Sequence, residues 1–238
     1  MDLRKKAEFT IAIILLLGIV AASVTLSRTV ASWMQLRQQE PGGQAGREVI
    51  VVDAGHGGRD PGKVGINDVY EKDLNLEIAL QLRDRLEDEG FEVVMIREED
   101  KGLYSEGSPN KKAEDMRNRV AIINETAPIM TISIHQNSYD DPSVRGAQVF
   151  YYSNSDEGER VANILQESIR RVDEGNRRES KANDTYYLLK KSTGAAVIIE
   201  CGFLSSPIDA AKLANQAYQE QLVEAIGDGI VKWASTRK

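Results

Sequence analysis

Cysteine is nearly absent from this sequence: Cys201 is the single one among 238 residues, so no disulfide can form within the chain. Basic residues are outnumbered, with 30 Lys and Arg against 37 Asp and Glu and a formal net charge of −7, and they are dispersed along the chain. A nucleic-acid-binding protein normally carries a basic stripe that contacts phosphates. We therefore expect a globular protein with neither a disulfide framework nor a nucleic-acid partner.

Long apolar runs are also lacking, except for one near the N-terminus. Three basic residues within the first six positions precede an apolar run over residues 9–26, a pattern typical of a signal peptide or a membrane anchor, with a buried core helix as the weaker alternative. Because the basic flank lies before the run, we expect the rest of the chain outside the cytoplasm, secreted or membrane-anchored. We predict a signal peptide or anchor over 1–26, a polar linker over 27–47 and one domain over 48–238.

Within this domain, strand-like and helix-like segments alternate. The run Val49–Val52 is β-branched, as in strands buried on both faces of a parallel sheet, whereas Leu74, Ile78 and Leu82 recur every four residues, as on a helix. The patterns predict strands over 49–52, 91–96, 129–134, 148–152 and 195–199, an edge strand over 186–189, and helices over 74–90, 113–125, 157–172 and 206–233. This alternation predicts a single α/β domain with helices on both faces of a mostly parallel, twisted sheet.

The chain has two histidines, and each follows a predicted strand. His56 lies in the glycine-rich turn after the first strand, and His135 directly follows Ile134 at the end of the third. Ligands bind at the carboxyl ends of the strands in open α/β sheets. A single histidine in such a place is more often structural, but two at equivalent strand ends predict a metal site.

Two glutamates are candidates to complete this site. Glu200 ends the apolar run Ala195–Ile199, where burial should raise its pKa and suit it to act as a general base, although a structural capping role is the alternative. Glu71 opens the first helix, where the helix dipole favours a carboxylate in any case. Two histidines and one carboxylate form a common zinc set with one position left for water. The residues alone do not decide which glutamate is ligand and which is base.

Five ordered sequence blocks resemble the zinc-dependent N-acetylmuramoyl-L-alanine amidases of the amidase 3 type. The blocks, which lie within residues 48–234, are 52–62, Glu71, 119–124, 133–138 and 200–205. The resemblance implies one zinc ion per chain, held by His56, Glu71 and His135, with Glu200 as the catalytic carboxylate. It also implies hydrolysis of the amide bond between the lactyl group of N-acetylmuramic acid and L-alanine in peptidoglycan.

A short N-terminal apolar segment, a bare catalytic domain and a Gly-Leu-Tyr loop within residues 101–110 resemble the spore-cortex members of this family. The resemblance implies removal of stem peptides from glycan strands during sporulation, as the first step towards the muramic-δ-lactam that is recognised at germination. It places the chain in the developing spore envelope, with an accessory activating protein as a partner to be tested.

The residues that stabilise the oxyanion are less well defined by the sequence. Asn137, Arg97 and backbone N–H groups of the Gly55–Gly58 turn, such as that of Gly57, are candidates. Gln136 stands where the family often has Ala, so its longer side chain is expected to alter the cleft.

Two other classes of function compete with this reading. The fold could serve as a catalytically silent peptidoglycan-binding or regulatory module, although Glu200 and the three ligands are all present. A phosphate-binding loop at Asp53–Gly58 is disfavoured because the Lys-Ser/Thr pair of the Walker pattern is missing.

Overall fold

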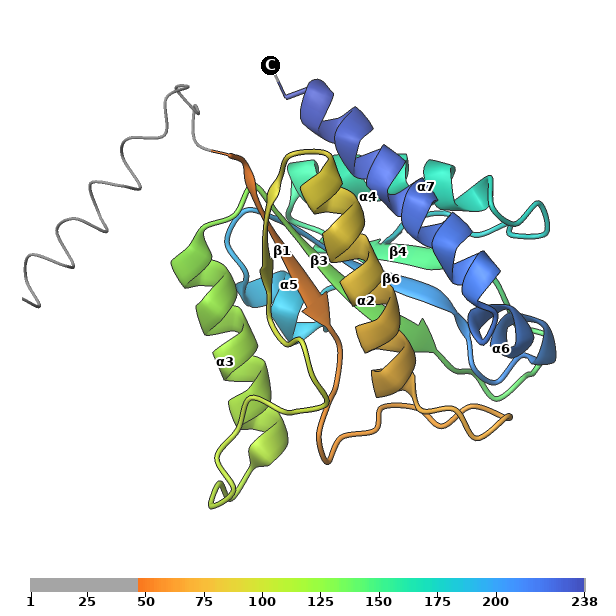
Figure 1. Cartoon of the computed structure of the whole chain (residues 1–238), viewed down its shortest axis with the longest axis horizontal. Helices are drawn as coiled ribbons and strands as arrows, with labels where there is room; N and C mark the ends of the chain where they lie inside the picture. Colours follow the sequence, from red (N-terminus) through yellow and green to blue (C-terminus); the bar gives the residue numbers. More distant parts are fainter. Residues whose placement is uncertain (1–46, 238) are drawn as a thin grey trace, which may run out of the picture. The chain divides into compact units, whose positions relative to one another are not determined.

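A computed structural model of the chain describes residues 47–237, so the predicted signal peptide or anchor (1–26) and all but the last residue of the predicted linker lie outside the described residues. Within 47–237, no helix has the length and apolar character needed to cross a bilayer. The elements, drawn in Figure 1, are β1 (Val49–Ala54), α2 (Glu71–Asp88), β2 (Glu92–Met95), α3 (Lys111–Thr126), β3 (Met130–Asn137), β4 (Gln148–Tyr151), α4 (Asp156–Arg170), β5 (Lys181–Ala182), α5 (Tyr187–Lys191), β6 (Ala195–Phe203), α6 (Pro207–Leu213) and α7 (Gln216–Ser235).

The strands form one six-stranded sheet in the order β2-β1-β3-β6-β4-β5. The pairs β1–β2, β1–β3, β3–β6 and β4–β5 are parallel, whereas β4 runs antiparallel to β6. The prediction of a mostly parallel sheet is therefore confirmed.

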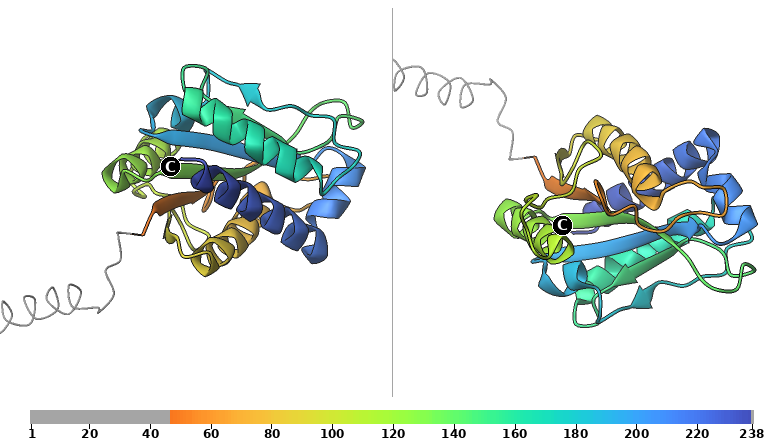
Figure 2. Two further views of the ribbon diagram at one scale, coloured as in Figure 1. Left: turned by 90° about the horizontal axis from the view of Figure 1, so that it is seen from above. Right: turned by 90° about the horizontal axis from the view of Figure 1, so that it is seen from below.

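Helices cover both faces of the sheet, as predicted (Figures 1 and 2). On one face α7 lies between α2 and α4, and their apolar side chains bury a core that includes Leu82, Leu165 and Ile226. On the other face α3 and α5 cover a smaller core that includes Ile123 and Leu188.

Strand alternation assigns the polar residues of the central strands to the face covered by α3 and α5. Ile134 of β3 and Ile199 of β6 face the larger core, and successive side chains of a strand point to opposite faces. His135 and Glu200 each follow one of these residues and are register partners across β3 and β6. The two side chains are thus neighbours at the carboxyl end of the sheet.

The predicted edge strand over 186–189 is wrong, because Tyr187–Lys191 forms the helix α5, and the strands at the two edges of the sheet are β2 and β5. The Asn183 side chain accepts the backbone N–H groups of Thr185 (2.8 Å) and Tyr186 (2.9 Å), which turns the chain into the helix. Four residues rich in tyrosine and leucine are too short a run to separate a strand from a helical turn by periodicity.

The single long helix predicted over 206–233 is also wrong, because it is divided into α6 and α7. The side chain of Asn215 accepts the N–H of Tyr218 (3.3 Å) and caps a new helix start. The last apolar strand is longer than predicted, since β6 continues past Glu200 to Phe203.

Candidate metal centre

His56 lies in the turn after β1, where two buried arginines hold the backbone carbonyl groups. Arg119 from α3 donates to the carbonyl oxygens of Ala54 (2.9 Å) and His56 (2.6 Å). Arg97 donates to those of Ala54 (2.8 Å) and Gly55 (3.0 Å). His56 itself has a φ of 61°, a left-handed conformation that costs a non-glycine residue roughly 1–2 kcal/mol. The arginines hold the turn in this conformation, which directs the imidazole towards α2.

Glu71, the first residue of α2, is held as a carboxylate at the centre of the site. Its side chain is 2% exposed; Oε2 accepts the N–H of Lys63 (2.8 Å) and Oε1 that of Gln136 (3.1 Å). Burial alone would raise the pKa of Glu71, but hydrogen bonds to His135 and His56 and the charges of these histidines outweigh it and hold the pKa well below its usual range. A metal ligand must be deprotonated in this way.

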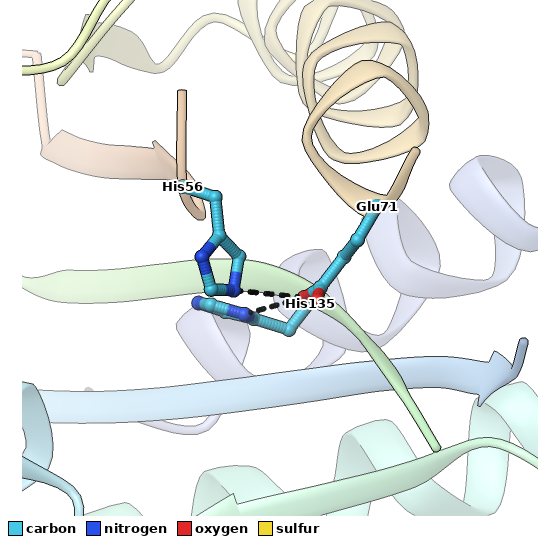
Figure 3. Close-up of side chains that lie close together, drawn as sticks. All are labelled: His56, Glu71 and His135. Carbon is cyan, nitrogen blue, oxygen red and sulfur yellow. Dashed lines mark hydrogen bonds and ion pairs between the residues drawn. The ribbon is translucent and has the colours of Figure 1, made fainter. Parts of the chain in front are cut away.

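Figure 3 shows His56, Glu71 and His135 converging from the turn after β1, the start of α2 and β3. His135 Nδ1 lies 2.9 Å and His56 Nε2 3.2 Å from the same oxygen, Glu71 Oε1. Gly55 permits this approach, because a Cβ at that position would overlap the His135 ring. One donor atom from each residue lies within 4.8 Å of the others, so the structure brings together all three predicted ligands.

The donor set fits a tetrahedral cation. Metal bonds of about 2.0–2.1 Å separate the ligand atoms by roughly 3.3 Å, close to the two nitrogen–oxygen distances of 2.9 and 3.2 Å. His56 Nδ1 lies 2.9 Å from Asp60 Oδ2, which directs Nε2 to the cluster, as the partners of histidine ligands commonly do. Burial alone would lower the pKa of His56, but hydrogen bonds to Asp60 and Glu71 raise it to about 9, so a bound cation must displace a proton.

Glu200 lies in the same pocket, whose volume is about 440 Å³. Its side chain is not part of the donor cluster, and the residue is 7% exposed. Burial raises the pKa of the Glu200 carboxyl. Oε1 accepts a hydrogen bond from the Tyr186 hydroxyl at 3.3 Å, whereas Oε2 is buried with no hydrogen-bond partner among the described residues. A buried carboxylate oxygen without a hydrogen-bond partner is uncommon in folded proteins and is a feature of catalytic positions.

Of the three predicted oxyanion candidates, one lines the pocket and two do not. Asn137 lines the pocket, and its Oδ1 accepts the N–H of Ser138 (2.8 Å). Arg97 is 1% exposed behind the turn, with its guanidinium bonded to backbone carbonyls, and does not line the pocket. The Gly57 N–H donates to the Asp60 carbonyl (3.0 Å) within the turn itself. Asn137 is therefore the candidate that the geometry favours.

Three residues around the site were missed in the sequence. Asp60 bonds His56, Tyr186 bonds Glu200, and Asn75 donates to the Gly55 carbonyl (3.1 Å) and to Glu71 (3.4 Å). Asn75 was detectable as a polar residue one helical turn after Glu71. Gln136 is 3% exposed and donates to Asn75 (3.2 Å), so its side chain supports α2 beside the donor cluster.

Comparison with known families yields one match that covers most of the chain. The family model Amidase_3, described as N-acetylmuramoyl-L-alanine amidase, matches residues 50–232. The match includes every residue of the donor cluster and Glu200.

Individual relatives agree with this match. The germination-specific N-acetylmuramoyl-L-alanine amidase of Bacillus subtilis is 40% identical over 189 residues, which are 78% of this chain and 79% of the relative. The solved structure of the CwlD amidase from Clostridioides difficile, in complex with the GerS lipoprotein, has a TM-score of 0.77 at 39% identity and covers 79% of this chain and 99% of that one. An N-acetylmuramoyl-L-alanine amidase from Clostridium difficile 630 has a TM-score of 0.73 at 28% identity, over 81% of this chain and 99% of that one.

Proposed function

The chain belongs to the Amidase_3 family of N-acetylmuramoyl-L-alanine amidases, and on this basis we propose that it is a zinc-dependent hydrolase of peptidoglycan. The bond cleaved joins the lactyl group of N-acetylmuramic acid to the L-alanine of the stem peptide. One zinc ion per chain is held by His56, Glu71 and His135, and Glu200 is the general base.

One observation carries this proposal: the residues of the donor cluster and Glu200 line one pocket. The cluster presents two imidazole nitrogens and one carboxylate oxygen, a common zinc set that leaves a position open. Glu200 is not among the three donors, and its Oε2 has no partner among the described residues. This arrangement supports different roles for the two glutamates, Glu71 as ligand and Glu200 as base.

The protein's own residues supply the proton transfer and the orientation of the substrate. When bound, zinc supplies a Lewis acid for the scissile carbonyl and for water. Glu200 accepts a proton from water in the pocket and donates it to the leaving nitrogen of alanine, a role that a pKa raised by burial favours. We assign to Asn137, which lines the pocket, the role of donor to the oxygen of the tetrahedral intermediate.

The biological setting that we propose follows from the relatives. The Bacillus subtilis relative is named germination-specific, which supports removal of stem peptides on the way to muramic-δ-lactam in spore cortex. Action outside the cytoplasm follows from a peptidoglycan substrate, and residues 1–26 would export or anchor the chain. Because the CwlD structure contains the GerS lipoprotein, we also propose an accessory protein as a partner of this chain.

Digestion of purified muropeptides by the full chain in detergent, followed by mass spectrometry, tests the proposal. The wild type should release free stem peptides and leave unsubstituted lactyl groups. Glu200→Gln should retain zinc but lose about 10²–10⁴-fold in rate, the usual contribution of a general acid–base. Glu87→Gln, an exposed position on α2, is the matched control and should keep full activity.

Two results would contradict the proposal. A Glu200→Gln variant with wild-type turnover would remove Glu200 from the base role. Binding of muropeptides without any release of stem peptide, even with zinc supplied, would instead favour the silent binding module.

A further inference from the structure

Tyr186 is held rigidly at the wall of the pocket. Its backbone N–H donates to the Asn183 side chain at 2.9 Å, just before α5 begins. Its ring packs edge-to-face on Phe150 of β4, with centroids 5.6 Å apart and an interplanar angle of 83°. An aromatic pair of this geometry is a favourable contact. The hydrogen bond restrains the backbone of Tyr186 and the aromatic contact restrains its ring, and together they set the direction in which the hydroxyl oxygen points.

The hydroxyl of Tyr186 is directed at Glu200. Its Oη donates to Glu200 Oε1 at 3.3 Å, a long distance for a hydroxyl donor, as is common for hydrogen bonds in active sites without substrate. Burial and the neighbouring Glu200 carboxylate raise the pKa of the Tyr186 hydroxyl, so it stays protonated at neutral pH. The group is therefore a permanent donor to one side of the carboxylate.

The two oxygens of Glu200 consequently differ. Oε1 is bonded to Tyr186, whereas Oε2 is buried with no partner among the described residues. A carboxylate free to rotate would exchange its oxygens and place neither one reliably. Held at Oε1, the carboxylate of Glu200 keeps one orientation at the wall of the pocket. A displacement of about 1 Å in a reacting group can cost roughly 10²-fold in rate.

We propose that Tyr186 is a positioning residue for Glu200: its hydroxyl holds Oε1 and so fixes the orientation in which the carboxylate accepts a proton from the water that attacks the amide. This inference rests on the proposed role of Glu200 as general base. It assigns to α5 and the turn before it a part in catalysis, although neither contributes a ligand to the metal cluster.

Tyr186→Phe tests the proposal, since it removes the hydroxyl and keeps the ring that packs on Phe150. In the full chain loaded with zinc, kcat on muropeptides should fall roughly tenfold to 100-fold. KM, zinc content and melting temperature should stay at wild-type values, because neither substrate contacts nor metal ligands are altered. A residue with a structural role alone would change the melting temperature or the zinc content instead.

Tyr151→Phe is the matched control, because Tyr151 on β4 donates to Glu159 at 3.1 Å outside the pocket. The same chemical change there should leave kcat unaltered. A second comparison places Tyr186→Phe in the Glu200→Gln background. If the hydroxyl acts through Glu200, the double variant should be no slower than Glu200→Gln alone, as expected for residues that act as one unit.

The outcomes separate this inference from the proposed function. An inactive Glu200→Gln with a fully active Tyr186→Phe would overturn the inference and leave the proposed function standing. An active Glu200→Gln would contradict the proposed function itself. A Tyr186→Phe variant that loses zinc, raises KM or slows Glu200→Gln further would show that Tyr186 acts elsewhere than on Glu200, and would overturn the inference.

Discussion

At the scale of single residues, Asp53 forms a buried ion pair and a hydrogen bond close to the candidate metal centre. It is 1% exposed on β1, accepts a hydrogen bond from Ser133 (2.6 Å) and forms an ion pair with Arg119, whose other partner is Asp115. Burial alone would raise the pKa of Asp53, but the charge of Arg119 and the bond to Ser133 hold it below its ordinary value of 3.8. Because Arg119 also holds the His56 carbonyl, this pair links the core to the ligand turn.

Asp53→Asn should therefore destabilise the fold by about 3 kcal/mol at neutral pH, because it breaks a buried ion pair and leaves Asp115 as the one carboxylate that still pairs with Arg119 among the described residues. A carboxyl whose folded pKa lies below 3.8 contributes stability that is present above pH 3.8 and is lost as the pH falls through the folded pKa. The difference in unfolding free energy between wild type and variant should thus shrink in acid. Urea melts across this pH range measure it.

Asp88→Asn, at an exposed position at the end of α2, is the control and should match the wild type at every pH. A gap between wild type and Asp53→Asn that stays constant into acid would contradict this account of Asp53.

The residues that the structure brings together in the donor cluster were largely predictable, because histidine is rare in the chain. Two histidines at two strand ends were sufficient to predict a metal site. The assignment of Glu71 and Glu200 to different roles came from resemblance, and the structure explains why spacing could not supply it. Glu71 reaches the histidines from a helix start 64 positions before His135, and no local pattern encodes that approach.

At the scale of elements, the loop between β1 and α2 packs closely against the side chain of Glu71. Gly62 has a φ of 67°, and a Cβ built there would lie 2.5 Å from Glu71 Oε2 and 2.8 Å from Glu71 Cβ. Gly90, after α2, has a φ of 88° but no heavy atom within 4 Å of such a Cβ. The two glycines thus share a left-handed backbone, but only Gly62 has a residue of the donor cluster, Glu71, beside it.

Alanine at either glycine should cost roughly 1–2 kcal/mol of stability through backbone strain. Gly62→Ala should in addition displace Glu71 and reduce zinc content, whereas Gly90→Ala should bind zinc normally. Elemental analysis after dialysis, alongside thermal melts, separates the two effects. If Gly62→Ala binds zinc as well as Gly90→Ala does, the loop has no role in placing Glu71.

The predictions of helices and strands were correct where an apolar pattern extends over many residues. They were wrong where a single side chain determines where a helix begins. The run Val49–Val52 and the repeat from Leu74 onwards gave a strand and a helix at nearly the observed positions. Two asparagines were decisive elsewhere, since Asn183 starts α5 and Asn215 divides α6 from α7. Each asparagine acts through a hydrogen bond from its side chain to the backbone, which the pattern of apolar residues does not reveal.

At the scale of the whole molecule, the donor cluster joins three distant parts of the chain. His56, Glu71 and His135 come from the turn after β1, the start of α2 and β3 (Figure 3). A cation bound by all three would bind the folded chain far better than the unfolded one, and would raise the melting temperature in proportion to the logarithm of its concentration. Bound metal, melting temperature and activity should therefore fall and recover together.

The measurement that tests this account most directly is a zinc titration of the metal-stripped full chain, with amidase activity and bound zinc followed in the same samples. Activity should be absent after stripping and should rise in proportion to zinc until one ion per chain is bound. His135→Ala should neither retain zinc nor regain activity. Wild-type turnover by the stripped protein, or by His135→Ala without bound metal, would contradict the account.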